Sequence, residues 1–321
     1  MIRPAELPPE FGEIRYKLHY VQRATNNEYS SECPTCGGVP HQSGDLPDRC
    51  RWFDDGRPRG WCRQCGAIFW PDMENGYKPD PAELKRWQDE REEAEKRTKA
   101  KAEHALDLIR QERVWLRYYE QQTDESRQRW VSWGIPSYWQ DYYKLGYDPA
   151  HVVYSGGDEW QTPTMTIPIF EPITYNVLNV RHRLLNPQKP GDKYRPERAG
   201  LPQSLFVACP DMKIGMDTLI VEGEKKAMVT WITSDNPLIQ VVGLPGCSPK
   251  QDLLKQFEES DPIYICLDPD AQDKADDIGR SLGKDRCRII DLPGKIDDLI
   301  IDYGLDKNAI NGLINTARRV R

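Results

Sequence analysis

The last third of the chain alternates short apolar runs with stretches of helical pattern. The apolar runs contain little polar alternation, which is typical of strands buried on both faces of a parallel sheet. We predict these strands at 218–222, 238–242, 262–268 and 287–292. Helices are predicted from Lys225, near 249–258, from Ala271 and at the C-terminal end.

Upstream of this region the pattern changes. Residues 164–170 and 175–185 alternate apolar and polar positions, which predicts strands of a mostly antiparallel sheet. Residues 127–149 predict a short helical hairpin, broken at a Gly-Ile-Pro sequence and closed at Gly146. Residues 83–103 hold seven acidic and seven basic side chains and predict a solvated helix. The apolar positions that follow, 105–119, indicate that this helix ends on the next domain.

Composition excludes several classes of protein. The chain has 321 residues and a net charge of -7, which argues against a wholly basic nucleic-acid binder. No stretch approaches the roughly 20 apolar residues that cross a bilayer, and the N-terminus has no secretory signal pattern. We therefore expect a cytoplasmic protein with no membrane partner. In that reducing compartment, its nine cysteines must serve metal binding or core packing.

Four cysteines form two Cys-x-x-Cys pairs separated by 25 residues, Cys33/Cys36 and Cys62/Cys65. Two such pairs predict a closed, tetrahedral zinc site. Gly37 and Gly66 follow the pairs, where the turn often needs a positive φ. The alternative ligands are His41 and Cys50, and the other cysteines are expected in the core: Cys209, Cys247, Cys266 and Cys287.

Positive charge is concentrated in two stretches. Around the cysteine pairs, arginines 49, 51, 57, 59 and 63 alternate with aromatic residues, which suits binding of single-stranded nucleic acid. Alternatively, these rings cover the metal site, and we expect about half of them in the core. Residues 181–200 carry six Lys/Arg against two acids and are expected to hold a phosphate backbone, or else to form a solvated loop.

Acidic residues follow the predicted parallel strands: Glu222, Asp268, Asp270, Asp297 and Asp298. Ligands bind at the carboxyl ends of such strands, and a single Asp there is often a helix cap. Acids at three strand ends instead favour a site for Mg²⁺ or Mn²⁺.

The segments LIVEGEKKAMVTW, ICLDPDAQDKA and DLPGKIDD resemble the Toprim domain shared by primases, topoisomerases and some nucleases. WGIPSYWQDYYKLGYDP, IPIF, RHRLL and KYRPERAGLPQSLFV resemble the rest of a primase catalytic core. With the paired cysteines in front, nearly the whole chain is similar to bacterial and phage-type DNA primases, most of all to phage or plasmid-like versions. It departs from them in having four cysteine ligands where many have a histidine, in Gln272 and Asp273 after DPDA, and in lacking a helicase P-loop.

The resemblance implies an α/β protein of four parts. These are a zinc-ribbon domain at 1–78, a charged helical linker at 79–123, an α+β basic subdomain at 124–215, and a Toprim α/β domain with a parallel central sheet at 216–321.

The implied activity is synthesis of short RNA primers on single-stranded DNA by two-metal nucleotidyl transfer. Glu222, Asp268 and Asp270, with Asp297, would bind Mg²⁺ or Mn²⁺ in catalysis. The phosphates of ribonucleoside triphosphates or of the template would contact basic residues, namely Lys225, Arg181, Arg183, Lys193 and Arg195. Lys226 is a further candidate for the triphosphate, and the alternative for Lys225 and Lys226 is that they are solvated lysines of a helix.

The implied partners are single-stranded DNA, ribonucleoside triphosphates and a replicative helicase. The implied location is the bacterial cytoplasm, with a phage or mobile element as a possible source of the gene. The alternatives are a Toprim metal-dependent nuclease and a catalytically weak single-stranded nucleic-acid binding protein.

Overall fold

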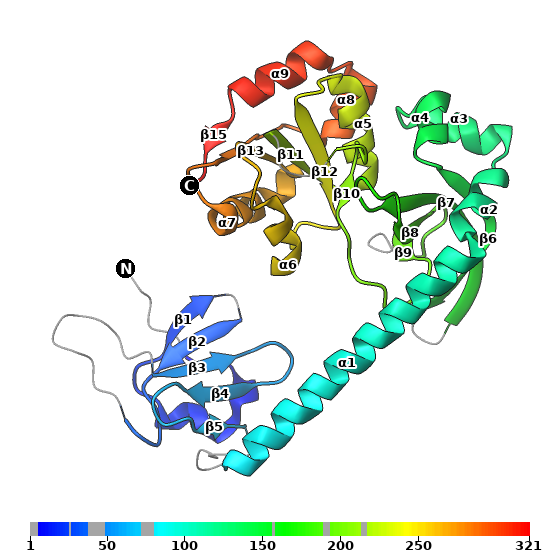
Figure 1. The fold of residues 1–321 in the computed structure, drawn as a ribbon. Coiled ribbons are helices and arrows are strands. Elements are labelled where there is room, and N and C mark those ends of the chain that lie inside the picture. The colour runs from blue at the N-terminus through cyan, green and yellow to red at the C-terminus, as the bar shows by residue number, and fades with distance from the viewer. Residues whose placement is uncertain are drawn as a thin grey trace. The chain divides into compact units, whose positions relative to one another are not determined.

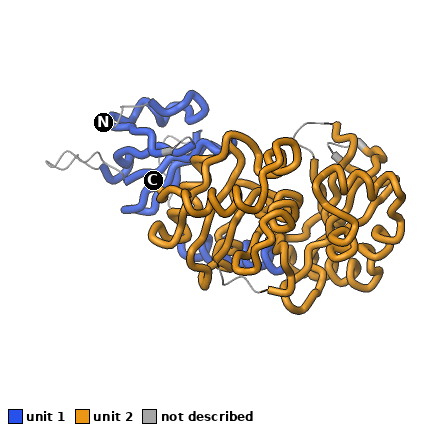
Figure 2. The backbone as a smooth tube through the Cα atoms, turned by 90° about the horizontal axis from the view of Figure 1, so that it is seen from above, with its two compact units in different colours: residues 1–96 blue, residues 97–321 orange. Residues whose placement is uncertain are grey.

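The computed structural model describes residues 6–25, 27–37, 49–71, 80–155, 158–188, 193–212 and 217–321. The chain divides into two compact units, residues 1–96 and residues 97–321 (Figure 2). His41, one of the alternative zinc ligands, lies outside the described residues. None of the described helices is long and apolar enough to span a membrane.

The first unit is built on a five-stranded antiparallel sheet whose strands follow chain order. The strands are β1 (Gln22–Thr25), β2 (Glu28–Ser31), β3 (Cys50–Phe53), β4 (Arg59–Cys62) and β5 (Ile68–Phe69), preceded by the 3-10 helix η1 (Pro9–Lys17). Trp52 is fully buried at the centre, where its indole N–H donates to Ser31 Oγ at 2.7 Å. A Cβ at Gly60 would lie 2.4 Å from the Trp52 ring, so only glycine fits beneath it.

The predicted charged helix is α1 (Pro81–Glu112). Asp80 caps its first turn, because Asp80 Oδ1 accepts from the Glu83 amide and Glu83 Oε2 accepts from the Asp80 amide. The exposed part carries i,i+4 ion pairs such as Arg91–Glu95 at 3.1 Å. Beyond residue 96, Ile109 of this helix joins a small core with β8. The sequence pattern thus describes both halves of the helix, solvated first and packed later.

The second unit contains a four-stranded antiparallel sheet in the order β6-β7-β8-β9. Its strands are β6 (Gly146–Ser155), β7 (Asp158–Phe170), β8 (Val177–Leu184) and β9 (Tyr194–Pro196), and the helices before it are α2 (Val114–Glu120), α3 (Asp124–Ser132) and α4 (Ser137–Tyr142). The sequence predicted α3, α4, β7 and β8. It missed β6, where the pairing with β7 shifts register between Asp148 and His151 and so accommodates Pro149 inside the strand.

A six-stranded sheet completes this unit in the order β10-β12-β11-β13-β14-β15. Its strands are β10 (Phe206–Val207), β11 (Asp217–Glu222), β12 (Ile239–Leu244), β13 (Ile263–Cys266), β14 (Cys287–Ile289) and β15 (Arg318–Arg319). The four central strands run parallel, as predicted, while the two edge strands run antiparallel to their neighbours. The edge strands were not predicted because each has only two residues.

Helices cover both faces of the six-stranded sheet (Figure 1). On one face lie α5 (Glu224–Ser234), α8 (Ile296–Tyr303) and α9 (Lys307–Asn315), and on the other lie α6 (Gln251–Leu254), η2 (Lys255–Phe257) and α7 (Gln272–Leu282), which η3 (Pro269–Ala271) precedes. Leu219 and Val221 face the first group and Ile220 faces the second. The core between the sheet and α5, α8 and α9 also contains Trp130 and Met165. One hydrophobic core therefore contains residues from both sides of residue 215.

A buried polar network lies between β6, β7, β8 and β9. His182 of β8 is fully buried, with Nδ1 2.9 Å from Thr164 Oγ1 and Nε2 2.7 Å from Glu197 Oε2. The His151 ring stacks on it, with 3.7 Å between ring centroids and 18° between planes. Asp148 Oδ2 lies 3.4 Å from His151 Nδ1.

Asp148, His151 and His182 bring one ligand atom each within 4.8 Å of one another, as a metal site would. The lone pairs of an imidazole lie in the ring plane, so two nearly parallel stacked rings do not direct them at one point. Both nitrogens of His182 are also occupied by hydrogen-bond partners. The geometry is that of a hydrogen-bonded network rather than a metal site.

The network makes stability depend on pH. Burial lowers the pKa of His182 below its ordinary value of 6.5. Burial alone would raise the pKa of Glu197, but hydrogen bonds from His182 and Tyr118 lower it on balance. Each shift means that the unfolded chain binds more protons than the folded chain, so stability falls as pH falls.

We expect the thermal transition of the second unit to move to lower temperature between pH 7.5 and 5.5. The effect of His182 begins below about pH 6.5 and is at most about 1.4 kcal/mol per pH unit for one group. His182→Gln should flatten this dependence, whereas His104→Gln, on the exposed surface of α1, should retain it. Differential scanning calorimetry measures the slope, and an unchanged slope in His182→Gln would contradict the assignment.

Candidate functional site

Four cysteines converge in the first unit, as predicted. The ligand atoms of Cys33, Cys36, Cys62 and Cys65 all lie within 4.8 Å of one another. Sγ–Sγ distances are 3.8 Å for Cys33–Cys65 and 3.6 Å for Cys36–Cys62. Backbone amides point at the sulfurs, since the Cys36 amide donates to Cys33 Sγ at 3.4 Å and the Cys65 amide donates to Cys62 Sγ at 3.5 Å. This donor set fits a structural zinc ion.

The turns and the electrostatics agree with that assignment. The glycines after the two pairs both have φ of 72°, as predicted. Burial alone would raise the pKa of Cys62, but amide hydrogen bonds from Cys65 and Gln64 lower it to about 7. Burial and the neighbouring thiols raise the pKa of Cys36 to about 12. Thiolates packed this closely repel one another, and a bound cation removes that repulsion.

Cys50 lies beside this cluster but is not one of the four. It is fully buried on β3, directly opposite Cys62 on β4. Burial and the nearby Cys33 and Cys62 raise the pKa of Cys50 well above its ordinary value. A neutral thiol in this position acts as a core side chain.

The sheet of the first unit has one buried face and one accessible face. The aromatic residues that alternate with the arginines are Trp52, Phe53, Trp61, Phe69 and Trp70. Trp52 and Phe69 are fully buried, whereas Trp61 and Trp70 are 45% and 40% exposed. Trp61 lines a groove of about 470 Å³ together with Ala24, Glu28, Arg51, Phe53 and Arg63. This accessible face presents aromatic rings beside guanidinium groups, as sites for single-stranded nucleic acid do.

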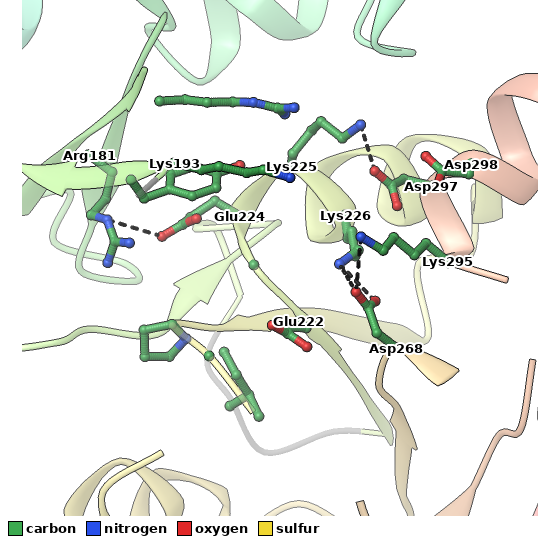
Figure 3. Close-up of a pocket in the computed structure, with 16 residues that line it drawn as sticks. Arg181, Lys193, Glu222, Glu224, Lys225, Lys226, Asp268, Lys295, Asp297 and Asp298 are labelled. Atoms are coloured by element: carbon green, nitrogen blue, oxygen red, sulfur yellow. Dashed lines mark hydrogen bonds and ion pairs between the residues drawn. The ribbon is translucent and has the colours of Figure 1, made fainter. Parts of the chain in front are cut away.

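A pocket of about 490 Å³ opens in the second unit at the carboxyl ends of β11, β12 and β13 (Figure 3). Glu222 ends β11, directly opposite Leu244 at the end of β12, and Asp268 follows β13. The parallel register brings these ends to one edge of the sheet. The lining residues are Arg181, Arg183, Lys193, Tyr194, Glu222, Gly223, Glu224, Lys225, Lys226, Leu244, Pro245, Gly246, Asp268, Lys295, Asp297 and Asp298.

Glycine allows the strand ends to approach closely at this edge. Gly223, between β11 and α5, has φ of 85°. A Cβ at Gly243 of β12 would lie 2.6 Å from the Gly223 carbonyl oxygen. The turn that carries Glu222 and Glu224 into the pocket therefore requires glycine at both positions.

Basic side chains compensate the carboxylates of the pocket (Figure 3). Lys226 Nζ lies 2.8 Å from Asp268 Oδ1, and Lys295 Nζ lies 3.6 Å from Asp268 Oδ2. Lys225 Nζ lies 2.6 Å from Asp297 Oδ2. These pairs offset the cost of gathering carboxylates in a partly buried site.

The basic side chains of the pocket do not fully compensate its carboxylates. Burial raises the pKa of Glu222, Lys226 lowers it, and the Asp268 and Asp270 carboxylates raise it again, with a net increase. Asp297 is buried, and within the part of the chain that the structure describes its Oδ1 has no hydrogen-bond partner. Hard oxygen donors in this state fit a divalent cation such as Mg²⁺ or Mn²⁺.

Most of the predicted site residues meet in this pocket, and two do not line it. Asp270 is exposed in η3, although its charge still acts on Glu222. Arg195 pairs with His182 across the β8–β9 ladder, and therefore lies on the face of the sheet that carries the buried network. Arg181 and Arg183 alternate with His182 along β8 and line the pocket from the other face.

Sequence reasoning missed several lining residues, including Glu224, Tyr194 and Lys295. Glu224 is buried and lies 3.8 Å from Arg181. The sequence contained a signal for two of them, because Glu224 belongs to the EGEK segment and Lys295 precedes the two aspartates of DLPGKIDD. No pattern marked Tyr194, whose place in the pocket depends on the register of β9 against β8.

No protein-family model and no curated protein matches the chain. Solved structures do. The zinc-binding and RNA polymerase domains of the Aquifex aeolicus primase align with 97% of this chain and 83% of that one, at a TM-score of 0.52 and 17% identity. The chain has a DNA primase-type fold.

Two further structures align with about two thirds of the chain. A DnaG primase catalytic domain bound to single-stranded DNA aligns with 69% of this chain and 84% of that one, with TM-score 0.53 and 16% identity. The catalytic core of the E. coli primase aligns with 64% of this chain and 79% of that one, with TM-score 0.51 and 16% identity. The primase-type fold thus extends over both the cysteine-bearing unit and the unit with the carboxylate pocket.

Loss of a cluster cysteine should remove zinc from the protein. We expect Cys62→Ser to reduce zinc from one ion per chain to nearly none and to unfold the first unit, because sites of this kind couple metal binding to folding. Cys50→Ala should retain zinc. Mass spectrometry of the metal content, with circular dichroism of each variant, measures both effects. Zinc lost from Cys50→Ala and kept by Cys62→Ser would contradict the ligand assignment.

Proposed function

We propose that the protein is a DNA primase, a nucleotidyltransferase that synthesises short RNA primers on single-stranded DNA. The observation that carries the proposal is the pocket at the carboxyl ends of β11, β12 and β13, where carboxylates face basic side chains. The primase-type fold supports it, as does the resemblance of its sequence segments to Toprim domains. Nucleotidyl transfer needs both halves of such a pocket, one for metal ions and one for phosphates.

The carboxylates would hold the catalytic metal ions. Glu222, Asp268 and Asp297 meet in the pocket, and Asp270 stands close enough to act on Glu222. Bound Mg²⁺ or Mn²⁺ would activate the attacking hydroxyl and neutralise charge on the transferring phosphate. Lys226 and Lys295 form ion pairs with Asp268. They therefore also lie where negative charge would accumulate during transfer.

The opposite wall of the pocket would bind phosphate groups. Arg181 and Arg183 extend from β8, and Lys193 directly precedes β9. Lys225, at the first turn of α5, joins them. We assign the phosphates of the incoming nucleotide or of the template to this wall, and expect the affinity to fall with increasing salt. Arg195 belongs to the same basic stretch but would act from outside the pocket.

The accessible face of the first unit would bind single-stranded template. Trp61 and Phe53 offer surfaces for base stacking, and Arg51 and Arg63 lie beside them in the same groove. Stacking of this kind depends little on which base is bound, so other contacts would have to select a start site. A replicative helicase as partner, a cytoplasmic location and a phage or mobile-element origin remain predictions of the sequence.

Synthesis should depend on the pocket carboxylates. With labelled ribonucleotides, Mn²⁺ or Mg²⁺ and a mixed-sequence single-stranded DNA, we expect short products whose yield falls about 100-fold or more in Asp268→Asn. The control is Asp252→Asn, because Asp252 forms an exposed surface pair with Lys255 away from the pocket. Gel electrophoresis of the products measures the effect.

The outcomes separate the proposed function from its alternatives. Cleavage of the DNA without synthesis, abolished by Asp268→Asn, would indicate a nuclease. Binding of DNA with neither reaction would indicate a binding protein. Equal synthesis in Asp268→Asn and wild type would place the chemistry elsewhere in the chain.

Template binding by the first unit has its own test. Trp61→Ala should weaken the affinity for single-stranded DNA roughly 5- to 150-fold, since stacking contributes about 1–3 kcal/mol per base. Trp87→Ala is the matched control, because Trp87 is a partly exposed tryptophan on α1 outside the groove. Fluorescence anisotropy of a labelled oligonucleotide gives both affinities. Equal losses in the two variants would contradict the assignment of this face.

A further inference from the structure

Arg183 differs from the other arginine and most lysines of the pocket in how its charge is held. Arg181, Lys225 and Lys226 each face a carboxylate of the pocket. For Arg183, no carboxylate of the described part of the chain lies within ion-pair distance. Its guanidinium instead lies over the ring of Trp133, with Cζ 3.9 Å from the ring centroid.

Contacts with α3 and with the main core hold Trp133 in place. It caps the C-terminus of α3, where its amide donates to the carbonyls of the last turn. Its ring meets the fully buried Trp130 edge to face, with centroids 5.2 Å apart. The next residue, Gly134, has φ of 81°, and a Cβ there would lie 3.1 Å from Ile301 Cγ1 and 3.4 Å from Val229 Cγ1. The indole is therefore a rigid platform at the edge of the main core.

The same platform faces a second cation of the pocket. Lys225 Nζ lies 6.0 Å from the Trp133 centroid and also bonds Asp297. Tyr194 adds a second ring near Arg183, with Cζ 5.9 Å from its centroid. Burial raises the pKa of Tyr194 to about 12, so its phenol stays neutral and contributes only its ring near neutral pH.

An aromatic face attracts a guanidinium without neutralising its charge. A carboxylate partner would hold the arginine equally well but would cancel the charge that an anion must meet. We propose that Trp133 is a positioning residue that holds Arg183 in the pocket as an uncompensated cation for the phosphates of the nucleoside triphosphate. The proposal rests on the proposed nucleotide site and adds to it the residue that orients one of its cations.

The test is a double-mutant cycle on binding of ATP with Mg²⁺, measured by isothermal titration calorimetry. Trp133→Met keeps an apolar side chain of adaptable shape but removes the ring. We expect it to weaken ATP binding about 2- to 30-fold, the range expected from a cation–π contact. Trp133→Phe should lose less, because it keeps an aromatic face. In synthesis, the KM for nucleotide should rise while kcat changes little.

The cycle separates positioning from a general effect on folding. Arg183→Met should weaken ATP binding, and Trp133→Met should then add little further loss in the Arg183→Met background. Trp139→Met is the matched control, because Trp139 is a partly buried tryptophan of α4 outside the pocket. It should leave ATP binding unchanged.

The possible results discriminate between the two proposals. Additive losses from Trp133→Met and Arg183→Met, or full affinity in Trp133→Met, would overturn the positioning role while the nucleotide site stands. If Trp133→Met fails to fold, the cycle is run with Trp133→Phe, whose partial loss must also vanish in the Arg183→Met background. Absence of ATP binding by the wild-type protein would overturn both the nucleotide site and the role of Trp133.

Discussion

The pairing of β11 with β12 and β13 is the constraint on which the candidate active site depends. Parallel pairing places Glu222 and Asp268 at one edge of the sheet, although they are far apart in sequence. Carboxylates in this position repel one another, and burial adds to the cost of their charge. The lysines of α5 and Lys295 reduce that repulsion. Burial, and after it the Asp268 and Asp270 carboxylates, still raise the pKa of Glu222, and Asp297 Oδ1 has no hydrogen-bond partner among the described residues. A divalent cation would relieve what remains.

Side chains of β8 alternate between the two faces of the sheet, and in this way the strand links the pocket to the rest of its unit. Arg181 and Arg183 face the pocket, whereas His182 between them is buried in the network with Glu197 and His151. One strand therefore provides phosphate-binding charge on one face and a rigid, hydrogen-bonded anchor on the other. We expect this network to help hold β8 in register and so to keep both arginines facing the pocket.

The sequence predicted what local pattern determines. Paired cysteines predicted the metal cluster, and the glycines after them predicted its positive-φ turns. Apolar runs followed by acids predicted that Glu222 and Asp268 would meet. The predictions that failed concerned residues whose positions depend on strand register or on tertiary contacts. Whether Arg183 or Arg195 enters the pocket depends on which face of β8 and β9 each occupies, and basic composition carries no such information. In the same way, the sequence could not show that Trp52 is buried and Trp61 is exposed, because this depends on which face of the sheet packs against the core.

The most direct test of the account is to locate the metal site by anomalous diffraction from crystals of the protein grown with Mn²⁺ and a nucleoside triphosphate. The account predicts an anomalous peak beside Glu222, Asp268 and Asp297, with the phosphates toward Arg181 and Arg183. A Mn²⁺ peak bound elsewhere, with this pocket still occupied by its lysine–aspartate pairs, would contradict the assignment of the pocket as the active site.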